Sequence, residues 1–167
     1  MSFDIYDASV PVFIASLTSL SKFLAKGAAH AEAKGIKPEA LLQARLAPDM
    51  HPLPNQIQIA SDAAKGAAAR LAGAEIPSFA DTETTFTELQ ARIEKTITFL
   101  KGLDRAAFKG AEDKEISLKA GPNDLKFSGA QFLTSFALPN FFFHVTTAFA
   151  LLRHNGVEIG KRDFLGG

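Results

Sequence analysis

The chain has 167 residues, of which 47% are hydrophobic and 22% are charged, proportions that are typical of a soluble globular protein. Its 18 basic residues balance its 18 acidic residues, so no net charge attracts nucleic acid or an anionic membrane surface. The absence of cysteine excludes disulfides, thiolate nucleophiles and Cys-ligated metal centres, and we expect a cytoplasmic protein.

Two apolar stretches are not predicted to enter a membrane. Acidic residues, with no Lys or Arg, precede the apolar run at 10–14, whereas a signal peptide begins with positive charge. The stretch 132–152 approaches the length of a membrane span, but a proline and two polar residues interrupt it. We therefore predict a single domain over residues 1–167, with no membrane partner and no nucleic-acid partner.

The first predicted helix covers residues 8–33, because Phe and Leu side chains recur there every three or four residues. Gly35 follows it as a typical C-terminal signal. Pro38 then opens a short helix over residues 39–45. The segment 46–54 holds three prolines in nine residues, which predicts an ordered and largely extended crossing.

Two further long helices are predicted in the middle of the chain. The first covers Asn55–Leu71, and its inward stripe is mostly alanine, which lets another helix approach closely. The second starts after Asp81, a good N-cap residue, and closes at Gly102. Glu83 and Glu88 are expected near its positive end, where the helix dipole favours acidic side chains.

A different period follows these helices. Polar and apolar residues alternate over 115–119 and again over 124–127, and turn-forming residues occupy 120–123. This pattern predicts a small β-hairpin with one face packed on the helices.

The last predicted helix is capped by Ser128 and ends at Asn155-Gly156. It is hydrophobic on nearly every side, so we expect it to be buried. Pro139 removes the hydrogen bond to the Ser135 carbonyl and predicts a kink about one turn before the central histidine. Four long helices, one long crossing and a small hairpin predict a mainly α fold, a four-helix bundle.

His144 and Asn140 form the main candidate site, because residues four apart lie on one face of a helix. They predict either a metal or small-ligand site in a bundle cavity, or a buried hydrogen-bonded pair beside the proline break. His51 in the crossing, and Gln58 with Asp62 on the second long helix, are predicted to complete such a site. The alternative is that they occupy a loop and a solvated helix face.

Several segments give the chain a specific resemblance to a known family. They are SVPVF near the start, DMHPLPNQIQ in the crossing, PNFFFHVTTAFALLRHNG in the last helix and GKRDFLGG at the end. Over essentially its whole length, the chain resembles domain-of-unknown-function family 1993, an uncharacterised bacterial family that is similar to the DinB-like four-helix bundles. This resemblance implies a DinB-like fold and a homodimer formed through helices.

The DinB-like resemblance also implies a divalent metal, such as zinc or nickel, held by three histidines. One lies on the second long helix, and two lie four residues apart on the last. His144 matches one of the paired histidines, and Asn140 replaces the other. The second long helix has no histidine, and His51, which precedes it, is the nearest candidate. The implied metal ligands are therefore His144 and His51, an incomplete set.

Three functions follow as hypotheses. The leading one is a small-ligand-binding or vestigial enzyme-like protein with a cavity near His144. The second is a metal-dependent hydrolase or thiol transferase with an incomplete histidine site. The third is a structural dimer without a ligand site, in which the run Phe141–Phe143 packs in the core and the subunit interface. No Gly-rich phosphate loop, GxSxG or HExxH motif assigns a reaction.

Overall fold

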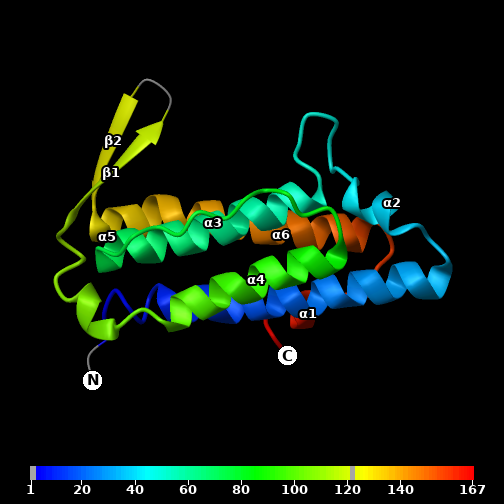
Figure 1. Ribbon diagram of the computed structural model, residues 1–167, viewed down its shortest axis with the longest axis horizontal. Coiled ribbons are helices and arrows are strands. Elements are labelled where there is room, and N and C mark those ends of the chain that lie inside the picture. The colour runs from blue at the N-terminus through cyan, green and yellow to red at the C-terminus, as the bar shows by residue number, and fades with distance from the viewer. Residues whose placement is uncertain (1–2, 121–122) are drawn as a thin grey trace.

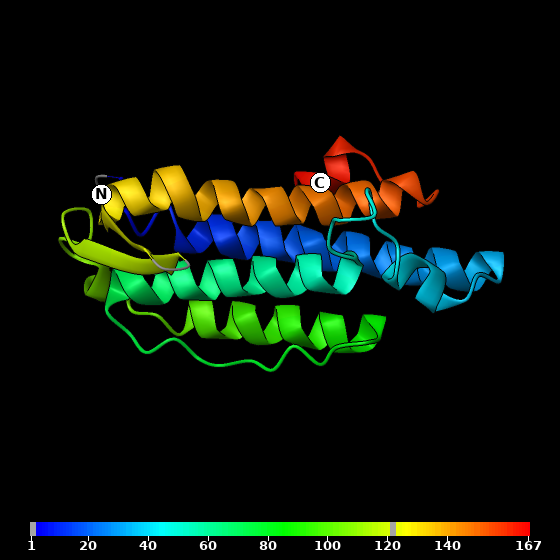
Figure 2. The ribbon, with the colours of Figure 1, turned by 90° about the horizontal axis from the view of Figure 1, so that it is seen from above.

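Four long helices lie side by side in a bundle in the computed structural model, which describes residues 3–120 and 123–167 (Figure 1). They are α1 (Val10–Lys34), α3 (Leu53–Ala72), α4 (Phe86–Lys101) and α6 (Leu138–His154). Each of α1 and α3 packs against both α4 and α6, so the order around the bundle is α1, α4, α3, α6 (Figure 2). The predicted mainly α bundle is confirmed.

Short elements join and flank the long helices. They are α2 (Pro38–Leu42), η1 (Arg105–Phe108), β1 (Glu115–Ala120), β2 (Asn123–Ser128), α5 (Gly129–Phe132), the π-helical turn η2 (Leu133–Ala137) and α7 (Lys161–Phe164). The α7 helix docks on α1, where Asp163 pairs with Lys26.

The crossing that runs the length of the bundle is residues 73–85, which we call the strap. It leaves the end of α3 and returns along the outside of α3 and α4 to the start of α4 (Figures 1 and 2). A strap is needed there because α3 and α4 run in the same direction. Segment 46–54, where the prolines predicted the crossing, is instead a loop that projects from the bundle and the start of α3 (Figure 1). No crossing along the bundle is needed there, because the end of α1 and the start of α3 lie toward the same end of the bundle (Figure 2).

Helix ends follow the local sequence in most cases. Gly35 ends α1 and Gly73 ends α3, both in the left-handed conformation, with φ of 63° and 69°. In each case the next residue donates its N–H back to a carbonyl five residues earlier. Several boundaries differ from the prediction by two residues or more: α1 begins at Val10 rather than Ala8, α3 begins at Leu53 rather than Asn55, and α2 ends at Leu42 rather than Arg45. Pro54 fits the first turn of α3, because the N–H it lacks would have no helical partner there.

Asp81 is not the N-cap of α4, contrary to the prediction. Thr85 caps the helix, and its hydroxyl accepts the Glu88 N–H while the Glu88 carboxylate accepts the Thr85 N–H. This reciprocal capping box satisfies two orphan donors at once, which a lone Asp cannot do. Asp81 and Glu83 both lie in the strap instead.

The predicted hairpin is present and projects from one end of the bundle (Figure 1). Its strands are antiparallel, with Ile116 opposite Phe127 and Leu118 opposite Leu125. The predicted turn at 120–123 falls partly on Gly121 and Pro122, which lie outside the described residues. At its base the backbone passes so close to a neighbouring segment that a Cβ on Gly129 would lie 1.7 Å from the Ala111 carbonyl oxygen.

Ser128 caps the last helical segment as predicted, because its hydroxyl accepts the Gln131 N–H. Where Pro139 predicted a kink, the helix has a π-helical turn over Leu133–Ala137, in which the Leu138 N–H bonds the Leu133 carbonyl. Such a turn widens the helix just before the proline ring, which would otherwise press on the preceding turn.

The core runs along the bundle axis and is largely aromatic and aliphatic. Phe13 of α1 meets Phe141 of α6 edge to face, with ring centroids 5.0 Å apart. The largest fully buried side chains also include Phe23, Phe132, Leu17, Leu20, Leu24, Leu53, Ile57, Leu71, Leu89 and Ile93. By length and composition, α1 and the continuous segment Gly129–His154 would each be able to cross a membrane, a property that core helices of soluble bundles share.

Candidate functional site

His144 meets the first turn of α3 rather than its helix neighbour Asn140. Its side chain is buried, and its Nδ1 lies 2.7 Å from Oε1 of Gln56. The Gln56 amide nitrogen in turn donates to the backbone carbonyl of His51, at 2.9 Å. The three residues form a hydrogen-bonded chain, which we call the His144 relay.

The relay determines which nitrogen of His144 carries the proton. A backbone carbonyl only accepts hydrogen bonds, so the Gln56 nitrogen must face His51 and the Gln56 oxygen must face His144. That oxygen also only accepts, and therefore Nδ1 of His144 carries the hydrogen. In the neutral ring, Nε2 is left with a free lone pair.

The electrostatics favour that neutral ring. Burial lowers the pKa of His144 below its ordinary value, and the nearby His51 imidazole lowers it further. Nε2 has no protein partner in the part of the chain that the structure describes. Among the described residues, Nε of Arg92 is the one side-chain nitrogen or oxygen that is both fully buried and without a partner. Because Nε2 of His144 also lacks a partner, it is not fully buried and keeps some contact with solvent. The site thus offers one oriented, unprotonated nitrogen.

The side chains around His144 do not fit a three-histidine metal site. Asn140 stands where one histidine would be, and His51 is an exposed residue whose backbone, not its ring, joins the relay. Among residues 3–120 and 123–167, no three His, Cys, Asp or Glu side chains gather in an arrangement that would hold a metal ion. A neutral amide is a weak ligand for zinc, which prefers His, Cys or carboxylate donors.

Asn140 and Asp62 line a different space, a hollow between α3, the end of the π turn and the hairpin. The hollow has a volume of about 180 Å³. Gln58 faces the strap, where its amide donates to Glu83 at 3.0 Å and accepts from Asn55. The five predicted site residues therefore occupy three places: the His144 relay, the hollow and the strap.

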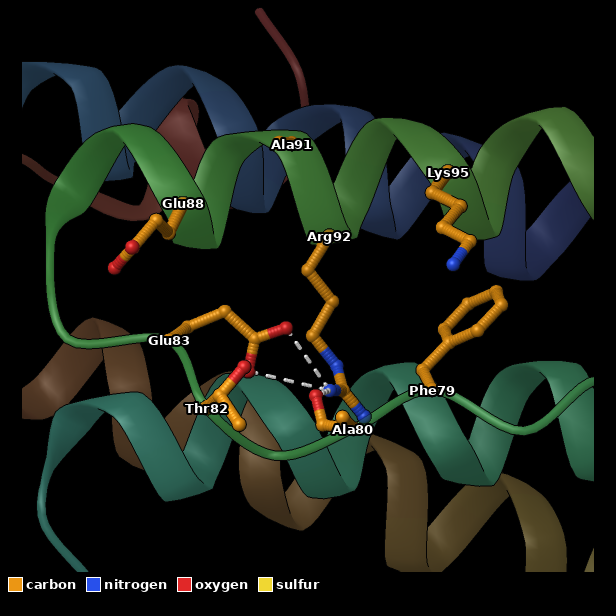
Figure 3. A pocket seen from close by; sticks show the side chains of 8 residues that line it. All are labelled: Phe79, Ala80, Thr82, Glu83, Glu88, Ala91, Arg92 and Lys95. Atoms are coloured by element: carbon orange, nitrogen blue, oxygen red, sulfur yellow. Dashed lines mark hydrogen bonds and ion pairs between the residues drawn. The ribbon is translucent and has the colours of Figure 1, made fainter.

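A buried arginine is the main polar feature that sequence reasoning missed. Arg92 extends from α4 between the strap and α3, and its side chain is 1% exposed (Figure 3). It contacts Asp62 at 2.8 Å, Asp81 at 2.9 Å and Glu83 at 3.1 Å, and it donates to the Ala80 carbonyl at 3.0 Å. The sequence did contain a signal for this burial, because Arg92 directly precedes Ile93 and lies on the buried face of α4.

Further charges surround Arg92 without completing a catalytic arrangement. Lys65 pairs with Asp62 and lies over the ring of Phe79 in the strap. Lys95 lies over the same ring (Figure 3). Partial burial raises the pKa of Glu83, but hydrogen bonds from Gln58, the backbone and Arg92 outweigh it, so the pKa is lowered overall. All three carboxylates near Arg92 are engaged with cations, and the cluster acts as a clamp that holds the strap on α3 and α4.

The bundle, its strap and the projecting hairpin define a DinB-like protein. A crystal structure of a DinB family member protein from Shewanella denitrificans is similar over 98% of this chain and 92% of that chain, with 41% sequence identity and a TM-score of 0.92. The chain belongs to the family described as "Domain of unknown function (DUF1993)", whose model matches residues 5–165. No curated protein matches the sequence.

Proposed function

We propose that this DinB-like protein binds a small molecule at His144, through the lone pair on Nε2. The observation that supports the proposal is the His144 relay, which holds the ring in one tautomer and one orientation. Fixing an imidazole by a hydrogen bond to its other nitrogen is a common feature of binding and catalytic histidines.

The surroundings of Nε2 indicate the chemistry of the ligand. A neutral Nε2 accepts a hydrogen bond, so the ligand presents a hydroxyl, amide N–H or ammonium group. Phe143 stands edge to face with His144, at 5.2 Å between ring centroids, and is 56% exposed. This ring offers an apolar surface beside the imidazole, so we infer a ligand with a donor group attached to an apolar body.

The incomplete histidine set supports binding over the metal-dependent alternatives. A hydrolase or a thiol transferase of the implied type needs several ligands around one ion, and only His144 keeps a suitable position and tautomer. The proposal therefore describes a binding protein that retains one residue of an enzyme-like site.

The test combines ligand binding with metal binding. A library of small hydroxyl and amine compounds is titrated into ¹⁵N-labelled protein, and the imidazole resonances of His144 are followed. Binding that shifts Nε2 and disappears in His144→Ala, but persists in the control His154→Ala, supports the proposal. If no compound moves His144, the proposal is wrong. Stoichiometric zinc or nickel that is lost in His144→Ala would favour the hydrolase or transferase instead.

We also propose a cytoplasmic homodimer that pairs through α6. Phe136 of the adjoining π turn η2 and Phe143 of α6 itself are 39% and 56% exposed, and a second subunit packed on this segment would cover both rings. Light scattering on wild type and on the double variant Phe136→Ser, Phe143→Ser measures the mass. A monomeric wild type would contradict the dimer.

A further inference from the structure

The hollow beneath the hairpin has apolar walls and one cationic group. Phe132, Phe136 and Ala137 line it from the helix, and Leu118 and Leu125 line it from the two strands. Arg70 stands at its α3 side. A concave apolar space with a few converging polar groups is the usual form of a small-molecule site.

Arg70 is a half-buried cation without a counterion. Among residues 3–120 and 123–167, no carboxylate lies within ion-pair distance of it, and its one side-chain hydrogen bond goes to the Gly66 carbonyl, at 3.0 Å. Burial lowers its pKa, which reflects a charge that the surroundings do not compensate. The Arg70 guanidinium is therefore free to pair with an anion from solution.

The sequence makes room for Arg70 in this position. A Cβ on Gly66 would lie 2.7 Å from Nη1 of Arg70, so a glycine in the middle of α3 lets the guanidinium fold along the helix. Glycine inside a helix costs about 0.5–1 kcal/mol relative to alanine. Gly66 thus leaves room for this one placement of the flexible Arg70 side chain.

The other polar groups of the hollow do not neutralise Arg70. Asp62 is already engaged by Arg92 and Lys65, each at 2.8 Å. Asn140 makes no side-chain hydrogen bond within the described part of the chain, so its amide N–H groups are available to an acceptor. Lys119 lies exposed at the rim and adds a second positive charge.

We propose that the hollow binds a compact monocarboxylate with an aromatic or cyclic body. Arg70 pairs with the carboxylate, the Asn140 amide donates to it, and the body packs against Phe132 and Phe136. The size agrees, because cavities of about 150 Å³ accept a benzene-sized molecule and this hollow has about 180 Å³. This site does not depend on the proposed function, since His144 faces the start of α3 and is not part of the hollow.

Benzoate is the probe for the test, with benzamide as its neutral isostere. Titration is followed by ¹H–¹⁵N NMR of the whole chain. We expect saturable benzoate shifts at Ala63, Ala67 and Asn140, and at least tenfold weaker binding of benzamide. Benzoate shifts that do not saturate, or that spread over the surface without the hollow, would overturn the proposal. Equal binding of benzamide would overturn the role of Arg70.

Two variants test the two halves of the proposal. Arg70→Gln removes the charge and should weaken benzoate binding at least tenfold. Arg153→Gln is the matched control, because Arg153 also bonds a carbonyl four residues away and makes no ion pair within the described residues, but lies outside the hollow. Ala63→Phe fills the hollow and keeps the charge, and it should abolish binding. Unchanged benzoate affinity in Arg70→Gln or in Ala63→Phe would refute the site, and circular dichroism checks that both variants are folded.

Discussion

Replacing Arg92 with leucine tests whether the clamp holds the strap. Removing one partner of a fully buried ion pair costs about 3–5 kcal/mol, because the other charge stays buried and unpaired. Here the partners differ in exposure: the Asp62 and Asp81 side chains are 44% and 56% exposed and regain water, whereas Glu83 is 13% exposed. We therefore expect a loss of about 2–4 kcal/mol in the free energy of unfolding, mostly through Glu83. The leucine also leaves the Ala80 carbonyl without its donor.

Urea unfolding followed by circular dichroism measures this loss. If the free energy of unfolding falls by about 2 kcal/mol per molar urea, the midpoint of unfolding should fall by about 1–2 M. Chymotryptic cleavage after Phe79 reports separately on the strap, and it should become faster in Arg92→Leu under native conditions. Lys95→Met is the control, because Lys95 lies over the same Phe79 ring but is exposed and pairs with no carboxylate among the described residues. A loss below about 1 kcal/mol with unchanged cleavage would refute the clamp.

Three further predictions concern single side chains. Wild type should be more stable than Glu83→Gln above the ordinary carboxyl pKa near 4.5, and this advantage should vanish as the pH falls through the lowered pKa of Glu83 in the folded protein. Urea unfolding from pH 3 to 7 measures the difference. Below pH 6.5, wild type should lose stability relative to His144→Gln, because His144 takes up a proton in the unfolded chain more readily than in the folded protein. A difference in unfolding free energy between the two proteins that stays constant from pH 5 to 8 would contradict the lowered pKa of His144. Gly129→Ala should lower the free energy of unfolding by about 1–3 kcal/mol or more, the range typical of overpacking, because the new Cβ would meet the Ala111 carbonyl. Gly160→Ala is the control for thermal unfolding, because the space around Gly160 is open and no such loss is expected.

Local sequence signals predicted the elements of this fold well. Gly35 after a leucine stripe marked the end of α1, and Ser128 marked the start of the last helical segment. Both signals work because the residue satisfies orphan backbone groups through contacts within a few residues. The hairpin was equally predictable, since strand alternation and turn residues are local properties.

Partners across the bundle were not predictable in the same way. Asn140 and His144 share a face of their own helix, yet His144 meets Gln56 and Asn140 lines the hollow. A separation of four residues brings two side chains together on one helix, but the packing and lengths of the neighbouring helices decide which residues each side chain contacts. Asp81 was misassigned for a related reason, because its partner Arg92 lies eleven residues away on another element.

The π turn connects the proline in the sequence to the shape of the hollow. In a regular α-helix, residues four apart are rotated by about 40°, so Phe132, Phe136 and Asn140 would drift by about 80° around the axis. The turn at Leu133–Ala137 has the wider five-residue hydrogen bond, which reduces that drift and keeps the three residues facing one space. Pro139 favours this turn, because its ring is incompatible with a regular preceding turn. The residue that breaks the helix thereby helps to align the ring surface and the amide that we propose as the carboxylate site.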